Sequence, residues 1–267
     1  MRGVRHAKKT IGKDLDMKYG VADYGMNVWD GGNYDLEERL SRLKEIGFNG
    51  IERLESTDAA ETLCKAALFR RLGMDFATVR MNNPAQSITA SAAMGRAYTW
   101  LAPGPCGRDV SMDTFVHRSK TFCAACAKYD LAAAIHNHLG QVVESQDELD
   151  YFMAKVPEAS LLLDIGHLAG AGGNVMKTLE KYYDRIAAIH FKDIFFKDEK
   201  AEKWNDRLRF CELGAGNKPG FVDWQSAAEF LKKKNYAKWV LVEHDTHLRD
   251  PFIDLKVSVD ALKKIME

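Results

Sequence analysis

Four short apolar segments in the second half of the sequence each end in a side chain that binds metal ions well. Their last residues are His136, Asp164, His190 and Glu243, and a stretch long enough for a helix separates each segment from the next. Apolar runs of this length are typical of parallel strands that are buried on both faces. Because the ends of parallel strands meet at one edge of a barrel, we expect these four side chains to converge there.

The remaining sequence contains the strands and helices that such a barrel needs. Further strands are expected at 18–24, 48–54, 74–81 and 97–102. Helical periodicity and end signals predict helices at 35–46, 58–72, 87–94, 111–129, 146–156, 175–183, 223–234 and 251–266. Eight strand–helix units in strict alternation predict the α/β class and a single eight-stranded parallel (β/α)8, or TIM, barrel, for which a length of 267 residues is suitable.

Charge and hydropathy exclude several classes of protein. Lys plus Arg and Asp plus Glu both number 38, so the formal net charge is zero, which disfavours a nucleic-acid-binding protein. No apolar run approaches the roughly 18 residues of a membrane span, so no membrane partner is expected. Residues 1–16 are polar and lack the apolar centre of a signal peptide. We expect them to form a flexible extension before a barrel domain at 17–267, in a cytoplasmic protein.

One long segment, residues 195–220, has no clear strand or helix pattern and carries many charges. We expect it to be an irregular loop at the same end of the barrel as His190. A loop of this length inside a compact domain is usually functional, such as a lid or a binding loop, and Arg209 within it is a candidate substrate contact. The alternative is a solvated, charged surface loop.

The four strand-end side chains together form a mixed set of nitrogen and oxygen donors. Two imidazoles and two carboxylates suit Mn²⁺, Co²⁺, Fe²⁺ or Zn²⁺ better than Ca²⁺, which prefers oxygen alone. Taken singly, each residue has a structural alternative, because a strand-end His is often only hydrogen-bonded and Asp164 could cap a turn. Their joint placement on four consecutive strand ends favours a shared metal site.

Further polar residues follow these strands. His138 lies two positions after His136, so both side chains point the same way if the strand continues. Lys192 lies two positions after His190, where its ammonium could hold a substrate oxyanion. The residues expected to contact substrate are Glu52, His167, Lys192, Asp193 and Arg209. For Glu52 the alternative is a rim residue that pairs with Arg53 or Arg80.

The motifs that carry a family resemblance are Leu-Leu-Leu-Asp164-Ile-Gly-His167, Ile-His190-Phe-Lys192-Asp193, Gly214-Ala-Gly216 followed by Asp223-Trp224, and Trp-Val-Leu-Val-Glu243. From about Tyr19 onward the chain resembles the xylose isomerase-like barrels, a group often labelled sugar phosphate isomerases/epimerases. The resemblance implies one divalent metal ion, bound by a Glu, an Asp, a His and a Glu at the ends of strands five to eight. Asp164, His190 and Glu243 match the last three. It also implies a small carbohydrate substrate and a possible homo-oligomer.

The first ligand departs from the family pattern. Isomerases and epimerases of this family commonly have Glu-Asn-His at the end of strand five, whereas this chain has His136-Asn137-His138-Leu-Gly140, which is similar to inosose dehydratases. Replacing the Glu removes one of the two bases that epimerisation uses. A His with a pKa near neutrality can instead protonate a departing hydroxyl. The substitution therefore favours a lyase activity over an epimerase activity.

The resemblance implies a role in carbohydrate metabolism. The expected activity is that of a divalent-metal-dependent isomerase or epimerase, with Mn²⁺, Co²⁺, Zn²⁺ or Mg²⁺, acting on a keto-sugar or related polyol through an enediolate. The alternative on the same site is a carbon–oxygen lyase, either an inosose dehydratase or an enzyme that eliminates from keto-glycosides. Glu243 is the first candidate for the base, His136 or His138 for the acid, and Lys192 is a further catalytic candidate. Two other classes, a multi-zinc endonuclease and a barrel that binds sugar without catalysis, are the less favoured alternatives.

Overall fold

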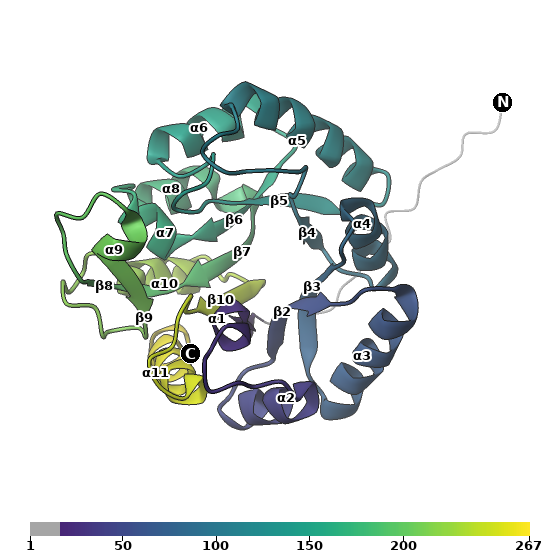
Figure 1. Cartoon of the computed structure of the whole chain (residues 1–267), viewed down its shortest axis with the longest axis horizontal. Coiled ribbons are helices and arrows are strands. Elements are labelled where there is room, and N and C mark those ends of the chain that lie inside the picture. Colours follow the sequence, from purple (N-terminus) through teal and green to yellow (C-terminus); the bar gives the residue numbers. More distant parts are fainter. Residues whose placement is uncertain (1–16) are drawn as a thin grey trace.

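Eight parallel strands form a ring inside a layer of helices in the computed structural model, which describes residues 17–267 (Figure 1). The strands are β1 (Lys18–Ala22), β2 (Gly50–Glu55), β3 (Asp75–Arg80), β4 (Tyr98–Trp100), β5 (Ala132–His136), β6 (Ser160–Asp164), β7 (Ile186–Phe191) and β10 (Trp239–Glu243). The sheet order is β3-β2-β1-β10-β7-β6-β5-β4, and contact between β3 and β4 brings the ring nearly to closure. The predicted single (β/α)8 barrel is confirmed.

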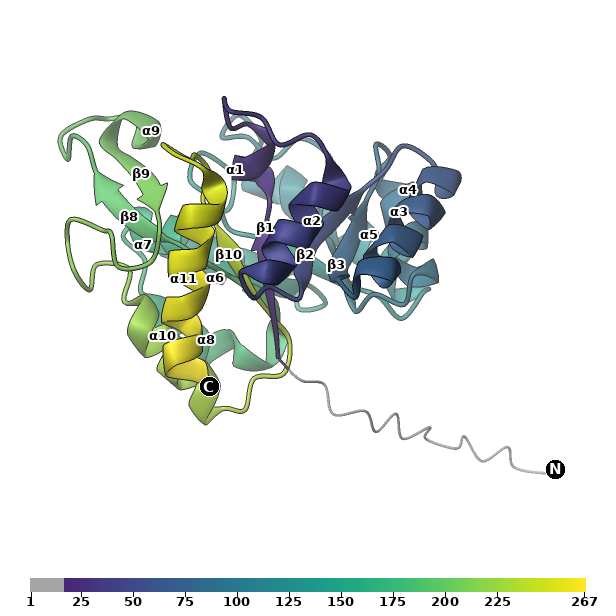
Figure 2. The ribbon, with the colours of Figure 1, turned by 90° about the horizontal axis from the view of Figure 1, so that it is seen from below.

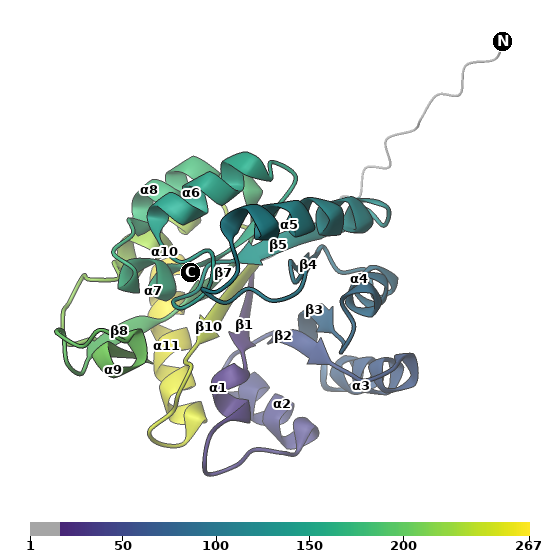
Figure 3. The same cartoon turned by 45° about the horizontal axis from the view of Figure 1, so that its top comes forward.

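Helices cover the outside of the ring, most of them in the connection between two consecutive strands (Figures 1 and 3). They are α2 (Leu36–Glu45), α3 (Ala59–Leu72), α4 (Pro84–Ala93), α5 (Met112–Ala127), α6 (Gln146–Lys155), α8 (Val175–Tyr182), α10 (Trp224–Lys233) and α11 (Pro251–Met266). Side-chain caps begin most of them, as in α6, where Ser145 and Glu148 form a reciprocal capping box. Gly73, with φ of 64°, ends α3 in the left-handed region that favours glycine.

Short elements lie on the rim where the strands end. They are α1 (Tyr24–Asn27), α7 (Ile165–Gly170) and an antiparallel hairpin of β8 (Asp193–Phe196) and β9 (Leu208–Cys211), with α9 (Trp204–Arg207) between its strands. Figure 2 shows α1, α9 and the hairpin at the same end of the barrel. The part of the chain that the structure describes has no helix long and apolar enough to cross a bilayer.

The expectation that residues 195–220 form an irregular loop is wrong in part. The hairpin strands and α9 account for several stretches of this segment. Ile194 pairs with Phe210 across the hairpin, and both side chains are buried. The strands are only four residues long, and Arg209 interrupts the apolar residues of β9, so the local pattern is too short to reveal them. Residues 197–203 connect the two halves. The flexible extension expected at 1–16 lies outside the described residues.

Alanine, leucine and tyrosine side chains fill the interior of the ring. A buried cluster inside the barrel consists of Ala77, Tyr98, Ala134, Leu162, Ala188 and Leu241. A larger apolar cluster packs between the strands and the surrounding helices. Beyond the inner cluster, the carboxyl ends of the strands carry polar side chains, and the site is built there.

Candidate metal centre

The four predicted ligands meet at the carboxyl ends of four adjacent strands. His136, Asp164, His190 and Glu243 are all buried, and one ligand atom of each lies within 4.8 Å of the others. Asp164 Oδ2 lies 3.4 Å from both His136 Nε2 and His190 Nδ1, and His190 Nδ1 lies 2.7 Å from Glu243 Oε2. Two nitrogens and two carboxylates in this arrangement fit a divalent transition-metal ion.

Side-chain contacts behind the cluster hold two of these residues in place. The side chain of Asn137 donates to the backbone carbonyl of Asp164 and accepts from its backbone N–H, each at 2.9 Å, and so joins β5 to β6. On the other side of the cluster, Glu52 Oε1 lies 3.2 Å from His190 Nε2 and accepts a 2.8 Å hydrogen bond from Trp100. A carboxylate behind one imidazole nitrogen leaves the other nitrogen free to bind a metal. Glu52 therefore orients His190.

Lys192 lies within the cluster rather than at its edge. Its side chain is fully buried, and its Nζ is 2.9 Å from Asp164 Oδ2, 2.8 Å from Glu243 Oε2 and 3.5 Å from Asp245 Oδ1. A Cβ at Gly166 would lie 2.2 Å from Lys192 Cγ, so this position in α7 accommodates the lysine only as glycine. One ammonium thus faces three carboxylates away from water.

Burial and this ammonium together determine the charge of the carboxylates. Burial opposes ionisation of Asp164 and Glu243, but Lys192 and the neighbouring imidazoles together outweigh it and hold the pKa of both well below the usual range. The pKa of Lys192 is raised by the same carboxylates despite its burial. Asp245 differs, because burial dominates and raises its pKa to about 7. The cluster therefore contains carboxylates of two kinds.

The two imidazoles of the cluster also differ. Burial disfavours the charged form of His190, but the carboxylates of Glu52 and Glu243 outweigh it and hold its pKa well above the usual value. Burial lowers the pKa of His136, and the hydrogen bond to Asp164 only partly offsets that effect. His136 is therefore neutral near pH 7, and a neutral imidazole is the form that binds a metal.

A second pair of imidazoles lies beside the cluster. His138 and His167 stack with their ring centroids 3.7 Å apart. The backbone N–H of Leu139 donates to His167 Nδ1 at 3.3 Å, so a neutral His167 carries its proton on Nε2. That Nε2 lies 3.6 Å from Asp245 Oδ2, and neither atom has a hydrogen-bond partner among residues 17–267. The donor on His167 and the acceptor on Asp245 therefore face each other without forming a hydrogen bond.

Trp204 of α9 covers this pair of imidazoles. Its ring centroid lies 6.1 Å from those of His138 and His167. A Cβ at Gly140 would lie 3.2 Å from Trp204 Nε1, and Arg207 of the same helix donates to the carbonyl of Gly170 at 2.9 Å. The hairpin segment is thus fastened over one side of the site.

Two predicted substrate contacts lie away from the cluster. Asp193 accepts hydrogen bonds from the backbone N–H groups of Gly214 and Gly216 at 3.0 and 3.4 Å, so its carboxylate holds the turn after β9. The guanidinium of Arg209 stacks on the ring of Phe195, 4.6 Å from its centroid, within the hairpin. By contrast, the other predicted positions, Glu52, His138, His167 and Lys192, all lie at the cluster.

Sequence reasoning missed Asp245 and Trp204. A signal for Asp245 was available, because it lies two positions after Glu243 and strand alternation directs both side chains to the same face. No such signal existed for Trp204, since it depends on how the hairpin folds back.

A cavity of about 330 Å³ borders the cluster. Arg53, Trp100 and His136 line it on the side of the barrel, and it extends between β3, β4 and α5. It is the space through which a small molecule could reach His136.

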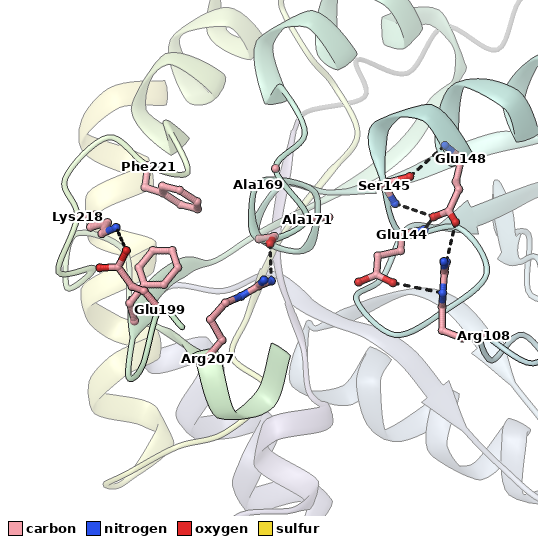
Figure 4. Close-up of a pocket in the computed structure, with 13 residues that line it drawn as sticks. Arg108, Glu144, Ser145, Glu148, Ala169, Ala171, Glu199, Arg207, Lys218 and Phe221 are labelled. Carbon is pink, nitrogen blue, oxygen red and sulfur yellow. Dashed lines mark hydrogen bonds and ion pairs between the residues drawn. The ribbon is translucent and has the colours of Figure 1, made fainter. Parts of the chain in front are cut away.

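Figure 4 shows a different cavity of about 500 Å³ at the edge of the hairpin. Its charged side chains pair with one another: Arg108 with Glu148 at 2.7 Å, and Lys218 with Glu199. Arg207 there donates to a backbone carbonyl of α7. None of the four cluster residues lines this cavity, so we do not place the chemistry in it.

Comparison with known proteins gives relatives in sequence. A model of the xylose isomerase-like TIM barrel family matches residues 77–265. The inosose dehydratase of Bacillus licheniformis is 36% identical over 122 residues, which are 43% of this chain and 41% of that protein. The inosose dehydratase of Lactiplantibacillus plantarum is 25% identical over 268 residues, 86% of this chain and 89% of that protein. In the Bacillus licheniformis match and in the three further matches of similar identity, the chain spans less than half the length of the relative.

Solved structures share the fold. The IOLI protein with a bound zinc atom has a TM-score of 0.70 at 14% identity, over 94% of this chain and 98% of that chain. D-psicose 3-epimerase from Clostridium cellulolyticum H10, solved with D-tagatose, has a TM-score of 0.68 at 10% identity, over 94% of this chain and 100% of that chain. At these identities the likeness shows the barrel fold alone.

Proposed function

The chain belongs to the xylose isomerase-like TIM barrel family, and from that membership we propose that it is a metal-dependent enzyme acting on a small keto-sugar or keto-polyol. The observation that carries the reaction type is His136, an imidazole at the strand-five position where the family's isomerases have a carboxylate. Together with inosose dehydratases as sequence relatives, it favours elimination of water, a carbon–oxygen lyase activity, over isomerisation.

Four side chains would hold the ion, namely His136, Asp164, His190 and Glu243. Mn²⁺, Co²⁺, Zn²⁺ or Mg²⁺ would supply Lewis-acid stabilisation of the negative charge that develops on the substrate oxygens. Lys192 keeps the carboxylates of Asp164 and Glu243 ionised and directed at the site, because its ammonium contacts both.

Elimination requires that a proton leave the carbon next to the carbonyl and that a hydroxyl leave the following carbon as water. We assign the first transfer to Asp245, whose Oδ1 lies 3.5 Å from Lys192 and whose Oδ2 has no hydrogen-bond partner among residues 17–267. Glu243, the first candidate from sequence, is less suited because it already contacts His190 and Lys192. The proton that Asp245 takes leaves with that hydroxyl as water, and His167, whose Nε2–H faces Asp245, could donate a hydrogen bond to the departing group.

The runner-up reaction is isomerisation or epimerisation on the same site. It shares the removal of the proton next to the carbonyl and differs in returning that proton to a carbon. Membership of the xylose isomerase-like TIM barrel family supports keeping it.

The test is incubation of the metal-loaded protein with ketoses, inososes and 3-keto-glycosides, followed by measurement of product mass. Loss of one water supports the lyase, and an isomer of unchanged mass supports the runner-up. The matched control is protein treated with a chelator and then reloaded. A metal-loaded protein that leaves the whole panel unchanged, or activity that survives chelation, contradicts the proposal.

A further inference from the structure

A second group of metal-binding side chains lies just beyond the end of β10, next to α11. Ligand atoms of His244, His247 and Asp254 lie within 4.8 Å of one another. His244 is 1% exposed, and the side chains of His247 and Asp254 are 1% and 8% exposed. His244 follows Glu243 directly, and its ring contacts Ser258 of α11, so it faces the helix layer.

Hydrogen bonds determine which nitrogen of His244 is free. The hydroxyl of Ser258 donates its only proton to the carbonyl of Asp254 at 3.0 Å and accepts from the N–H of Leu213 at 3.1 Å. His244 Nε2, at 3.3 Å from the same oxygen, must therefore be the donor of that contact. A neutral His244 thus has a bare Nδ1, and this buried atom has no hydrogen-bond partner within the described chain.

His247 and Asp254 complete the set. Nδ1 of His247 is also buried and unpartnered in residues 17–267, and it lies 3.7 Å from Asp254 Oδ2. Arg249 Nε donates to the other oxygen, Asp254 Oδ1, at 2.6 Å. Arg249 thus holds one oxygen of the Asp254 carboxylate, and the second oxygen is available to a metal ion. Buried unpartnered nitrogens are costly, and a metal ion would satisfy both of them at once.

We propose that His244, His247 and Asp254 bind a second divalent transition-metal ion, of the Zn²⁺ or Co²⁺ type. Two imidazole nitrogens and one carboxylate suit these borderline ions, with water in the fourth position. The Ser258 contact to His244 and the Arg249 contact to Asp254 are the outer hydrogen bonds that such ligands usually have. The ion would link the segment after β10, through His244 and His247, to α11, through Asp254. This site does not rest on the proposed reaction.

The test is metal stoichiometry after a chelator-treated protein is reloaded with Co²⁺ and freed of excess ion. We expect the wild type to retain two equivalents, and His247→Ala or Asp254→Asn to lose one of them. Asp164→Asn should lose the other. His117→Ala, at an exposed position of α5, is the matched control and should retain both. In contrast to His247→Ala, His247→Cys should retain the second equivalent of Co²⁺. It should also show a thiolate-to-cobalt absorption band in the near ultraviolet.

Two results would overturn the inference. One is a wild type that retains a single equivalent, which Asp164→Asn removes. The other is retention of both equivalents by His247→Ala and Asp254→Asn. If either variant fails to fold, the wild-type stoichiometry and the His247→Cys absorption band still decide. A single equivalent that is lost in His247→Ala but kept in Asp164→Asn would support this site and contradict the proposed catalytic one.

Discussion

The ammonium of Lys192 lies 2.8 Å from the carboxylate of Glu243, and both side chains are buried. Asp164, at 2.9 Å, and Asp245, at 3.5 Å, share the same ammonium. A lysine placed among three buried carboxylates compensates negative charge that a single divalent ion would also compensate. This relationship makes Lys192 and the proposed ion partly interchangeable for stability.

Replacing Lys192 with Met should destabilise the metal-free protein by about 3 kcal/mol, since removing one partner leaves buried charges uncompensated. The loss should be smaller when a divalent metal is present, because the ion offsets the same charge. Urea unfolding with and without metal measures both values. Lys256→Met, which breaks an exposed pair with Asp260, is the control and should change little. Equal losses with and without metal would contradict the shared role.

Asp245→Asn and Glu243→Gln separate the base from the ligand. We expect Asp245→Asn to retain metal and lose turnover by about 100-fold or more, the usual effect of removing a general base. Glu243→Gln should lose metal affinity as well as turnover. Metal content and turnover are measured on the same samples. An active Asp245→Asn variant, with a metal-loaded and inactive Glu243→Gln, would return the base to Glu243.

His136→Glu restores the carboxylate that the family's isomerases have at this position. We expect loss of the dehydration product and, if a second base is all that epimerisation lacks in the wild type, the appearance of an isomer of unchanged mass. Mass spectrometry and chromatography of the products distinguish the two. Undiminished dehydration in this variant would mean that the imidazole of His136 has no part in choosing the reaction.

Stability should fall in mild acid because His138 is buried in its neutral form. Burial lowers the pKa of His138 to about 4, whereas an unfolded His titrates near ~6.5. Between these values the unfolded state binds the proton and the folded state does not, so this contribution is present above ~6.5 and is lost as the pH falls toward 4. From pH 7 to pH 5 the loss is about 2 kcal/mol.

The check on His138 is chemical unfolding of the chelated wild type and of His138→Asn at both pH values. The wild type should lose about 2 kcal/mol more than the variant over this interval. If the two proteins lose stability in parallel, His138 is not the source of the acid sensitivity.

Trp204→Ala should admit water to the stacked imidazoles of His138 and His167. Since burial is the largest cause of the low pKa of His138, its pKa should rise from about 4 toward the ordinary histidine value. NMR titration of the histidine resonances measures the shift, with Trp204→Phe as the control that keeps an aromatic cover. An unchanged titration in Trp204→Ala would show that the hairpin does not exclude water from this pair.

The barrel and the cluster of four strand-end side chains could be predicted because each leaves a local pattern. Buried parallel strands appear as short apolar runs, and the polar residue that ends each run marks the point where all strand ends meet. The same pattern failed at β8 and β9, whose strands are too short and too interrupted by charge. It also placed Asp193 and Arg209 among the substrate contacts, although Asp193 holds the turn at Gly214 and Arg209 stacks on Phe195.

By itself, the sequence determined the alternation of strands and helices, the parallel barrel and the four side chains at neighbouring strand ends, because period and spacing are properties of the chain alone. Only the tertiary structure decided that Lys192 is buried among three carboxylates, that Asp245 Oδ2 and His167 Nε2 face each other, and that ligand atoms of His244, His247 and Asp254 lie close together. These properties depend on burial and on contacts between residues distant in sequence, which no local pattern records.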